Sequence, residues 1–191
     1  MQRINISIAI ILMVVSLQCI SCNGRTKSLK QQFLLLTYGL PDFDRQNSTN
    51  VVADKWGIRF RTVAGCIVTQ ELENMVEEQN RSVEPLIAKK YGKDWKDKFY
   101  KEVEAEFEIE KKVTALVDSI SYIKQKQTDM EKQGNGLHYI MSPDADADRY
   151  NVWVQGWGEW KGKDKWVTYY TFLVDYQTKS VNLLSDKVTM E

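Results

Sequence analysis

The residues best suited to contact a ligand gather in one short stretch near the C-terminus. Four of the six tryptophans lie between Trp153 and Trp166, and the last two of them flank a basic loop. Large flat side chains stack on sugars and anchor protein partners. Strand parity places Trp153 and Trp157 on one face, where burial under helices would also explain them. Core packing is therefore the favoured interpretation of the cluster, and a binding rim is the alternative, with Trp157, Trp160, Lys161, Lys163 and Trp166 as its candidate residues.

Three aspartates at alternate positions could bind a cation. Asp144, Asp146 and Asp148 match the first, third and fifth positions of a calcium loop, and carboxylate oxygens are the ligands that calcium prefers. Arg149 stands where that loop needs glycine, and Gln155 stands where it needs a bidentate glutamate, so an EF-hand is excluded. Two interpretations stay open: a weak cation site completed by other loops, or a solvated turn between strands.

A nucleophilic site would have to pair Cys66 with His138, the only histidine. The residues around Cys66, Val63–Val68, are small and apolar, and desolvation raises the pKa of a thiol. We therefore expect Cys66 to be buried, reduced and structural. A lone histidine without other ligands makes no zinc site, so His138 is expected to be structural or on the surface.

Other catalytic patterns receive little support. The glutamates at alternate positions from Glu102 to Glu110 are explained more simply as a solvated helix face than as a pair of catalytic carboxylates. No phosphate loop, dinucleotide fingerprint, HExxH or GxSxG occurs in the sequence, and its CxxC match, Cys19-Ile20-Ser21-Cys22, lies close to the N-terminus, after an apolar run. We therefore expect no cofactor and favour a protein that is not an enzyme, while a hydrolase with an unrecognised carboxylate site stays open.

The N-terminus carries an apolar run from Ile4 to Leu17, preceded by Arg3. A run of about fourteen residues is too short to span a bilayer, which needs about 20, and it suits the core of a signal peptide. The sequence Ile20-Ser21-Cys22 then resembles the lipobox of bacterial lipoproteins, although Cys19 stands where such signals usually carry leucine. An ordinary secreted protein or an uncleaved anchor is the alternative.

This resemblance implies cleavage before Cys22 and lipidation of its thiol. One acyl chain binds membranes only marginally, and a diacylglyceryl group would supply the second chain that durable anchoring needs. The residues Asn23, Gly24 and Arg25 follow without an acidic side chain, which in Gram-negative lipoproteins resembles sorting to the outer membrane. The protein is therefore expected to be held in the cell envelope by a lipid anchor.

The rest of the chain predicts one α+β domain, with residues 1–21 as signal peptide, 22–47 as lipidated tether and lead-in, and 48–191 as the domain. Helical spacing predicts a helix from Ser48 or Thr49 to Gly57, one from Thr69 to Tyr91 interrupted near Pro85, and a long one over 95–128. Aromatic and β-branched runs predict a strand over 58–66 and later strands over 137–141, 150–157, 166–176 and 181–184.

Helices followed by an antiparallel meander are typical of two to three helices packed on a sheet of four to five strands. The residues Asp175–Ser180 predict a tight hairpin turn, and those from Trp157 to Trp166 predict a longer one. The segment Val174–Val181 resembles the last hairpin of periplasmic cystatin-like and PepSY-type domains, over too few residues to imply a function.

Composition narrows the functional classes. The 191 residues carry 26 basic and 26 acidic side chains, so the chain lacks the basic excess typical of nucleic-acid binders. The chain combines an expected location in the cell envelope with clustered tryptophans and no recognised catalytic pattern. We therefore expect a noncatalytic binding or accessory domain for another envelope protein, of the inhibitor or immunity type. A surface lipoprotein that binds glycans is the alternative.

Overall fold

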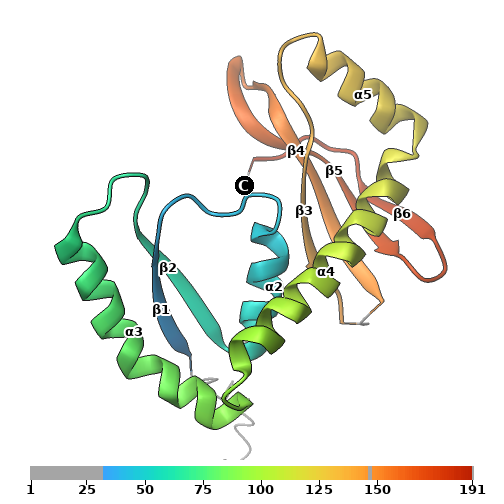
Figure 1. Cartoon of the computed structure of the whole chain (residues 1–191). Helices are drawn as coiled ribbons and strands as arrows, with labels where there is room; N and C mark the ends of the chain where they lie inside the picture. The colour runs from blue at the N-terminus through green and yellow to red at the C-terminus, as the bar shows by residue number, and fades with distance from the viewer. Residues whose placement is uncertain (1–31, 146–147, 191) are drawn as a thin grey trace, which may run out of the picture. The chain divides into compact units, whose positions relative to one another are not determined.

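The protein has an α+β fold, as the sequence predicts. The computed structural model describes residues 32–145 and 148–190, and its main compact unit begins at Gln32 (Figure 1). The elements are β1 (Phe33–Tyr38), α2 (Gln46–Trp56), β2 (Ile58–Ala64), α3 (Gln70–Tyr91), α4 (Trp95–Asp118), α5 (Ser121–Glu131), β3 (His138–Pro143), β4 (Arg149–Trp160), β5 (Lys163–Asp175) and β6 (Ser180–Ser185). The expected signal peptide, Cys22 and the start of the tether lie outside the described residues.

Strands β1 and β2 form a two-stranded parallel sheet, with α2 as the connection between them. Gly57 ends α2 with a φ of 67°, a left-handed conformation that glycine adopts without steric cost. Strand β1 was expected to be part of the lead-in, because its apolar run is short and follows a polar segment. Its alternate residues Phe33 and Leu35 are buried in a core shared with α2, α3 and the start of α4.

The outer edge of β1 is covered by one side chain of α3. The amide of Asn80 accepts a hydrogen bond from the Leu36 backbone nitrogen and donates one to the Leu36 carbonyl, both at 2.9 Å. A carboxamide presents one acceptor and one donor in a plane, as a neighbouring strand would. Asn80 therefore satisfies the backbone of β1 at Leu36, on the edge that no described strand pairs with.

Helix α4 contributes to both large cores. Trp95, Phe99 and Val103 belong to the core around β1 and β2, whereas Val113 and Val117 belong to the core under the C-terminal sheet. The gaps of four residues within each group and of ten residues between the groups keep these positions on one helical stripe. The segment from Val103 to Ile109, in which apolar residues alternate with glutamate as in a strand, is helical, as the prediction of a long helix requires.

Two helix predictions need correction. The expected helix over 95–128 is divided, because Ile120 is extended between α4 and α5 and Ser119 bonds the Leu116 carbonyl through its hydroxyl. Serine and β-branched residues are weak helix formers, and the break lets Ile123 pack in the core under the C-terminal sheet. By contrast, α3 runs without interruption through Pro85.

The C-terminal strands form an antiparallel sheet in the order β3-β4-β5-β6. Strands β4 and β5 are longer than predicted and are joined by a two-residue turn, with φ of 52° at Lys161 and 76° at Gly162. Two successive positive φ angles give the turn whose twist matches a hairpin. In the described part of the chain, no helix is both long and apolar enough to cross a membrane.

The two hydrogen bonds of Asn80 to Leu36 can be tested by substitution. We expect Asn80→Ala to lower the free energy of unfolding by about 1 to 3 kcal/mol, because it leaves a partly buried N–H and C=O of Leu36 without partners. Asn74→Ala on the same helix removes only an exposed hydrogen bond and should change stability by less than about 0.5 kcal/mol. Urea unfolding of both variants measures the difference; equal effects would contradict the role of Asn80.

Candidate functional site

Two of the predicted tryptophans form an exposed pair on the sheet. Trp157 and Trp166 are directly opposite across β4 and β5, with ring centroids 5.9 Å apart in an edge-to-face arrangement. Trp157 is 50% exposed and Trp166 is 38% exposed. The Trp166 indole N–H donates to Gln155 at 3.0 Å, and its ring lies 4.9 Å from His138. These contacts hold Trp166 in one orientation while part of its surface stays open to solvent.

Trp160 does not join this pair. It is half-buried and packs against a small core of Met130, Val167 and Tyr169, beneath α5. Lys161 and Lys163 are exposed at the hairpin turn, and the Lys161 ammonium lies 5.7 Å above the Trp160 ring. The structure therefore divides the predicted candidates into the aromatic pair, Trp157 and Trp166, and a packed tryptophan beside the turn.

The aromatic pair continues into a wider apolar face. In the ladder, Gln155 lies opposite His138 and Trp153 lies opposite Ile140, and Trp153 shares with Gln155 and Trp157 the face that alternates with the buried residues Val152 and Val154. Ile140 is 46% exposed, and Trp153 is half-buried. The expectation that helices bury Trp153 and Trp157 is therefore wrong: the helices pack on the opposite face.

The predicted cation loop provides no cluster of ligands in the residues described. Asp144 forms an ion pair with Arg149 at 3.3 Å, and Asp148 accepts a hydrogen bond from the Tyr176 hydroxyl at 3.0 Å. Asp146 lies outside the described residues. Elsewhere in 32–145 and 148–190, no three His, Cys, Asp or Glu side chains are close enough together to hold a metal ion.

Cys66 contradicts the expectation of burial. It lies in a bend just after β2 and is exposed, and its neighbour Ile67 is 87% exposed. The apolar flanks suggested a buried strand, but β2 ends at Ala64 and belongs to a sheet of only two strands. Residues 65–67 are all exposed in the part of the chain that the structure describes, so their apolar composition does not indicate burial.

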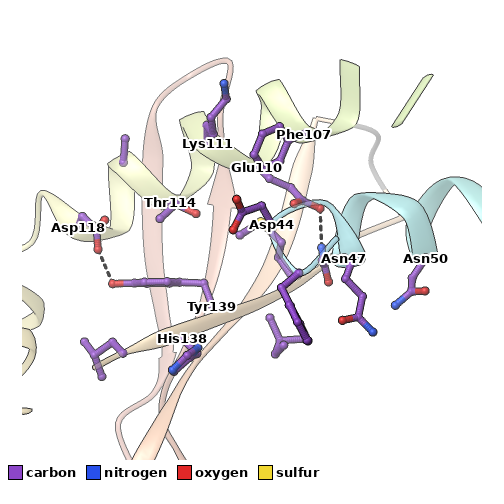
Figure 2. A pocket seen from close by; sticks show the side chains of 16 residues that line it. Asp44, Asn47, Asn50, Phe107, Glu110, Lys111, Thr114, Asp118, His138 and Tyr139 are labelled. Atoms are coloured by element: carbon purple, nitrogen blue, oxygen red, sulfur yellow. Dashed lines mark hydrogen bonds between the residues drawn. The ribbon is translucent and has the colours of Figure 1, made fainter. Parts of the chain in front are cut away.

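A hollow that the sequence analysis missed lies among α2, α4 and β3 (Figure 2). It has a volume of about 910 Å³ and is lined by both polar and apolar side chains. On its wall, Glu110 is only 6% exposed and accepts a hydrogen bond from the Asn47 amide at 2.6 Å. Burial raises the pKa of Glu110 above its usual value, although the bond from Asn47 opposes this shift.

Two more carboxylates, Asp44 and Asp118, line this hollow, and Asp118 lies at its other end (Figure 2). The Tyr139 hydroxyl on β3 donates to Asp118 at the end of α4 (Figure 2). Burial raises the pKa of Tyr139, and the nearby Asp118 charge adds to this effect. Asp118 is eight residues beyond Glu110, about 12 Å along the helix. Carboxylate pairs in glycoside hydrolases are about 5 to 9.5 Å apart, so these two residues do not form such a pair.

Three of the α4 glutamates that the sequence assigns to a solvated helix face contact other elements. Glu102 accepts hydrogen bonds from Lys55 at 2.7 Å and Trp56 at 3.1 Å on α2, and Glu106 accepts one from Tyr150 on β4 at 2.7 Å. Together with Glu110 they recur every four residues, which places them on one helical stripe. That spacing was the signal in the sequence that these carboxylates contact other elements.

A second hollow lies beside the aromatic pair, at the edge of β4 next to α5. It has a volume of about 550 Å³ and is lined by Trp157 and by several carboxylates and carboxamides, among them Asp129, Gln133, Asn135, Glu159 and Asp164. The Tyr169 ring crosses β4 here, and its hydroxyl donates to the Trp157 carbonyl at 2.5 Å. A Cβ at Gly158 would lie 2.2 Å from that hydroxyl oxygen, so only glycine allows this crossing.

Comparisons with protein-family models, with curated proteins and with solved structures give no match to this chain.

The raised pKa of Glu110 predicts how stability varies with pH. A carboxyl whose pKa is higher in the folded state holds its proton longer there, so its contribution to stability is present below the unfolded pKa of about 4.5 and is lost as pH rises through the folded value. Glu110→Gln keeps an acceptor for Asn47 and cannot ionise. We expect its stability relative to wild type to increase from pH 4.5 to pH 7.

Urea unfolding at both pH values measures this change. Glu108→Gln, two residues earlier, is the matched control, because Glu108 is exposed and forms an ion pair with Lys111. It should show no such gain at neutral pH. A Glu110→Gln variant whose pH dependence equals that of wild type would show that Glu110 titrates normally.

Proposed function

We propose that this protein is an envelope-anchored lipoprotein whose folded domain is a noncatalytic binding module for another envelope protein, of the inhibitor or immunity type. The observation that carries the proposal is the exposed pair Trp157 and Trp166, on the face of the C-terminal sheet that the helices leave open. Exposed tryptophans surrounded by apolar surface are the residues that most often dominate protein interfaces.

Preorganisation of this pair supports the proposal. Trp166 is held by Gln155 and His138, and Trp157 packs against it, so binding a partner would cost these side chains little conformational entropy. The face around them includes Trp153 and Ile140, which would extend the apolar centre of an interface. Lys161 and Lys163 at the nearby turn would lie at its polar rim.

Alanine substitution tests which tryptophans bind. Trp157→Ala and Trp166→Ala should each weaken the complex with a partner isolated from envelope extracts of the native host by about 2 kcal/mol or more, about thirtyfold in Kd. Trp160→Ala is the matched control and should leave the affinity unchanged, because Trp160 packs under α5. Isothermal titration with the purified partner measures each Kd; a loss restricted to Trp160→Ala would refute this assignment.

The lipid anchor is a separate part of the proposal and rests on the segment Ile20-Ser21-Cys22. We expect a fatty-acid probe supplied to the native host to label the wild-type protein, and Cys22→Ala to abolish the label, because the thiol is the acceptor. Cys66→Ala keeps Cys22 and controls for labelling at the exposed thiol. Equal labelling of wild type and Cys22→Ala, or none in wild type, would refute lipidation at Cys22.

Glycan binding is the second candidate, and the hollow beside Trp157 favours it. An aromatic ring next to carboxylates and carboxamides is suited to stack on a sugar and hydrogen-bond its hydroxyl groups. A glycan array distinguishes the two candidates. Binding that is lost in Trp157→Ala and Asn135→Ala but kept in Trp166→Ala would favour the glycan, whereas loss of a protein partner in Trp166→Ala would favour the protein.

A further inference from the structure

Strand β2 has one unpaired edge. Among the described residues it pairs only with β1, in parallel register, with Phe33 opposite Ile58. The Phe33 N–H donates to the Gly57 carbonyl, which fixes the hydrogen-bond pattern: Arg59 and Arg61 direct their backbone groups toward β1. Phe60 and Thr62 therefore direct their N–H and C=O groups toward the outer edge.

The two edges of this sheet differ. Asn80 satisfies the outward backbone groups of β1 at Leu36. On β2, no hydrogen bond given by the described part of the structure reaches the outward N–H and C=O of Phe60 or Thr62. Residues 59–62 are exposed. A sheet of two strands is marginal by itself, and an exposed edge is a template for another strand.

The side chains along this edge carry positive charge without a counter-ion. Arg59 and Arg61 alternate with the inward-facing residues of β2 and share the solvent face of the sheet with Leu34, which is 39% exposed. Neither arginine has an ion pair, hydrogen bond or ring contact within residues 32–145 and 148–190. Two unpaired guanidinium groups thus lie on a strand that can accept a neighbour.

A second copy of the chain does not suit this edge. Two β2 strands paired about a twofold axis would place Arg59 and Arg61 of one copy beside those of the other, and like charges across a strand pair are destabilising. A strand with carboxylates at alternate positions would instead pair with both arginines. The positive charge of Arg59 and Arg61 thus favours pairing with an acidic segment and disfavours pairing with a second copy of β2.

We propose that β2 accepts an extended acidic segment of a partner protein as a third strand, through the outward backbone groups of Phe60 and Thr62 and the side chains of Arg59 and Arg61. This edge belongs to the N-terminal sheet, so it is a docking surface separate from the aromatic pair. Main-chain hydrogen bonds would provide affinity, and the arginines would select acidic sequences.

The probe is a synthetic ten-residue peptide that alternates glutamate with valine, and its control has lysine in place of each glutamate. We expect the acidic peptide to bind the full chain in fluorescence anisotropy, with weaker binding at higher salt, and to slow hydrogen exchange at the Phe60 and Thr62 amides. The lysine peptide should not bind. Trp157→Ala should leave this affinity unchanged, which separates the result from the proposed function.

Substitutions at Thr62 test the edge itself. Thr62→Pro removes an N–H that points away from β1, so the ladder stays intact while the edge loses a donor and gains a bulky ring. Thr62→Val keeps that N–H and, like Thr62→Pro, loses the hydroxyl contact with Thr37. We expect Thr62→Pro to weaken binding at least tenfold and Thr62→Val to bind as wild type does.

Charge reversal keeps the test decisive if Thr62→Pro fails to fold. The double variant R59E/R61E should bind the lysine peptide and lose the glutamate peptide. Equal binding of both peptides to wild type, binding of neither, or a dimer in sedimentation that disappears in R59E/R61E would each overturn the proposal.

Discussion

Helix α4 is the element on which the rest of the structure depends, because it is the one helix that places residues in both large cores of the described chain. Its first half buries Phe99 against the parallel pair of strands, and its second half buries Val113 under the antiparallel sheet. Its polar stripe then bonds α2 and β4. A change that shortened or rotated this helix would disturb both cores together, so the packing of both sheets depends on the same helix.

Polar side chains complete what the backbone leaves unpaired. Asn80 acts as a strand for β1, Tyr169 crosses β4 to bond the Trp157 carbonyl, and Asn47 satisfies the buried carboxylate of Glu110. The bonds of Asn80 and Asn47 join elements far apart in the sequence, whereas the bond of Tyr169 joins the two strands of one hairpin. A buried polar group without a partner costs free energy, so each of these hydrogen bonds requires one particular arrangement of the two elements that it joins. Apolar contacts are less directional and tolerate more arrangements.

The sequence was sufficient for features with a local cause. The four antiparallel strands, the end of α2 at Gly57 and the helical nature of α4 follow from residue type and periodicity. It was insufficient where tertiary contacts decide. Strand β1 is short and is completed by pairing with β2 and by Asn80. The helix break at Ile120 accompanies the packing of Ile123 under the C-terminal sheet, and the apolar neighbours of Cys66 do not bury it. The aromatic cluster was visible in the sequence, but the face on which each tryptophan lies required the register.

The distribution of helices decides where this fold can bind. The helices adjoining the C-terminal sheet cover one face, which leaves Trp157 and Trp166 on the other, and Asn80 of α3 covers the outer edge of β1 at Leu36. The three hydrophobic cores include neither surface, although two polar residues, Gln155 and Thr168, are buried on the tryptophan face. Formation of these cores therefore does not account for the exposed tryptophan pair or for two arginines without counter-ions on a bare strand edge. A partner that supplies apolar area in one case and carboxylates in the other would account for both.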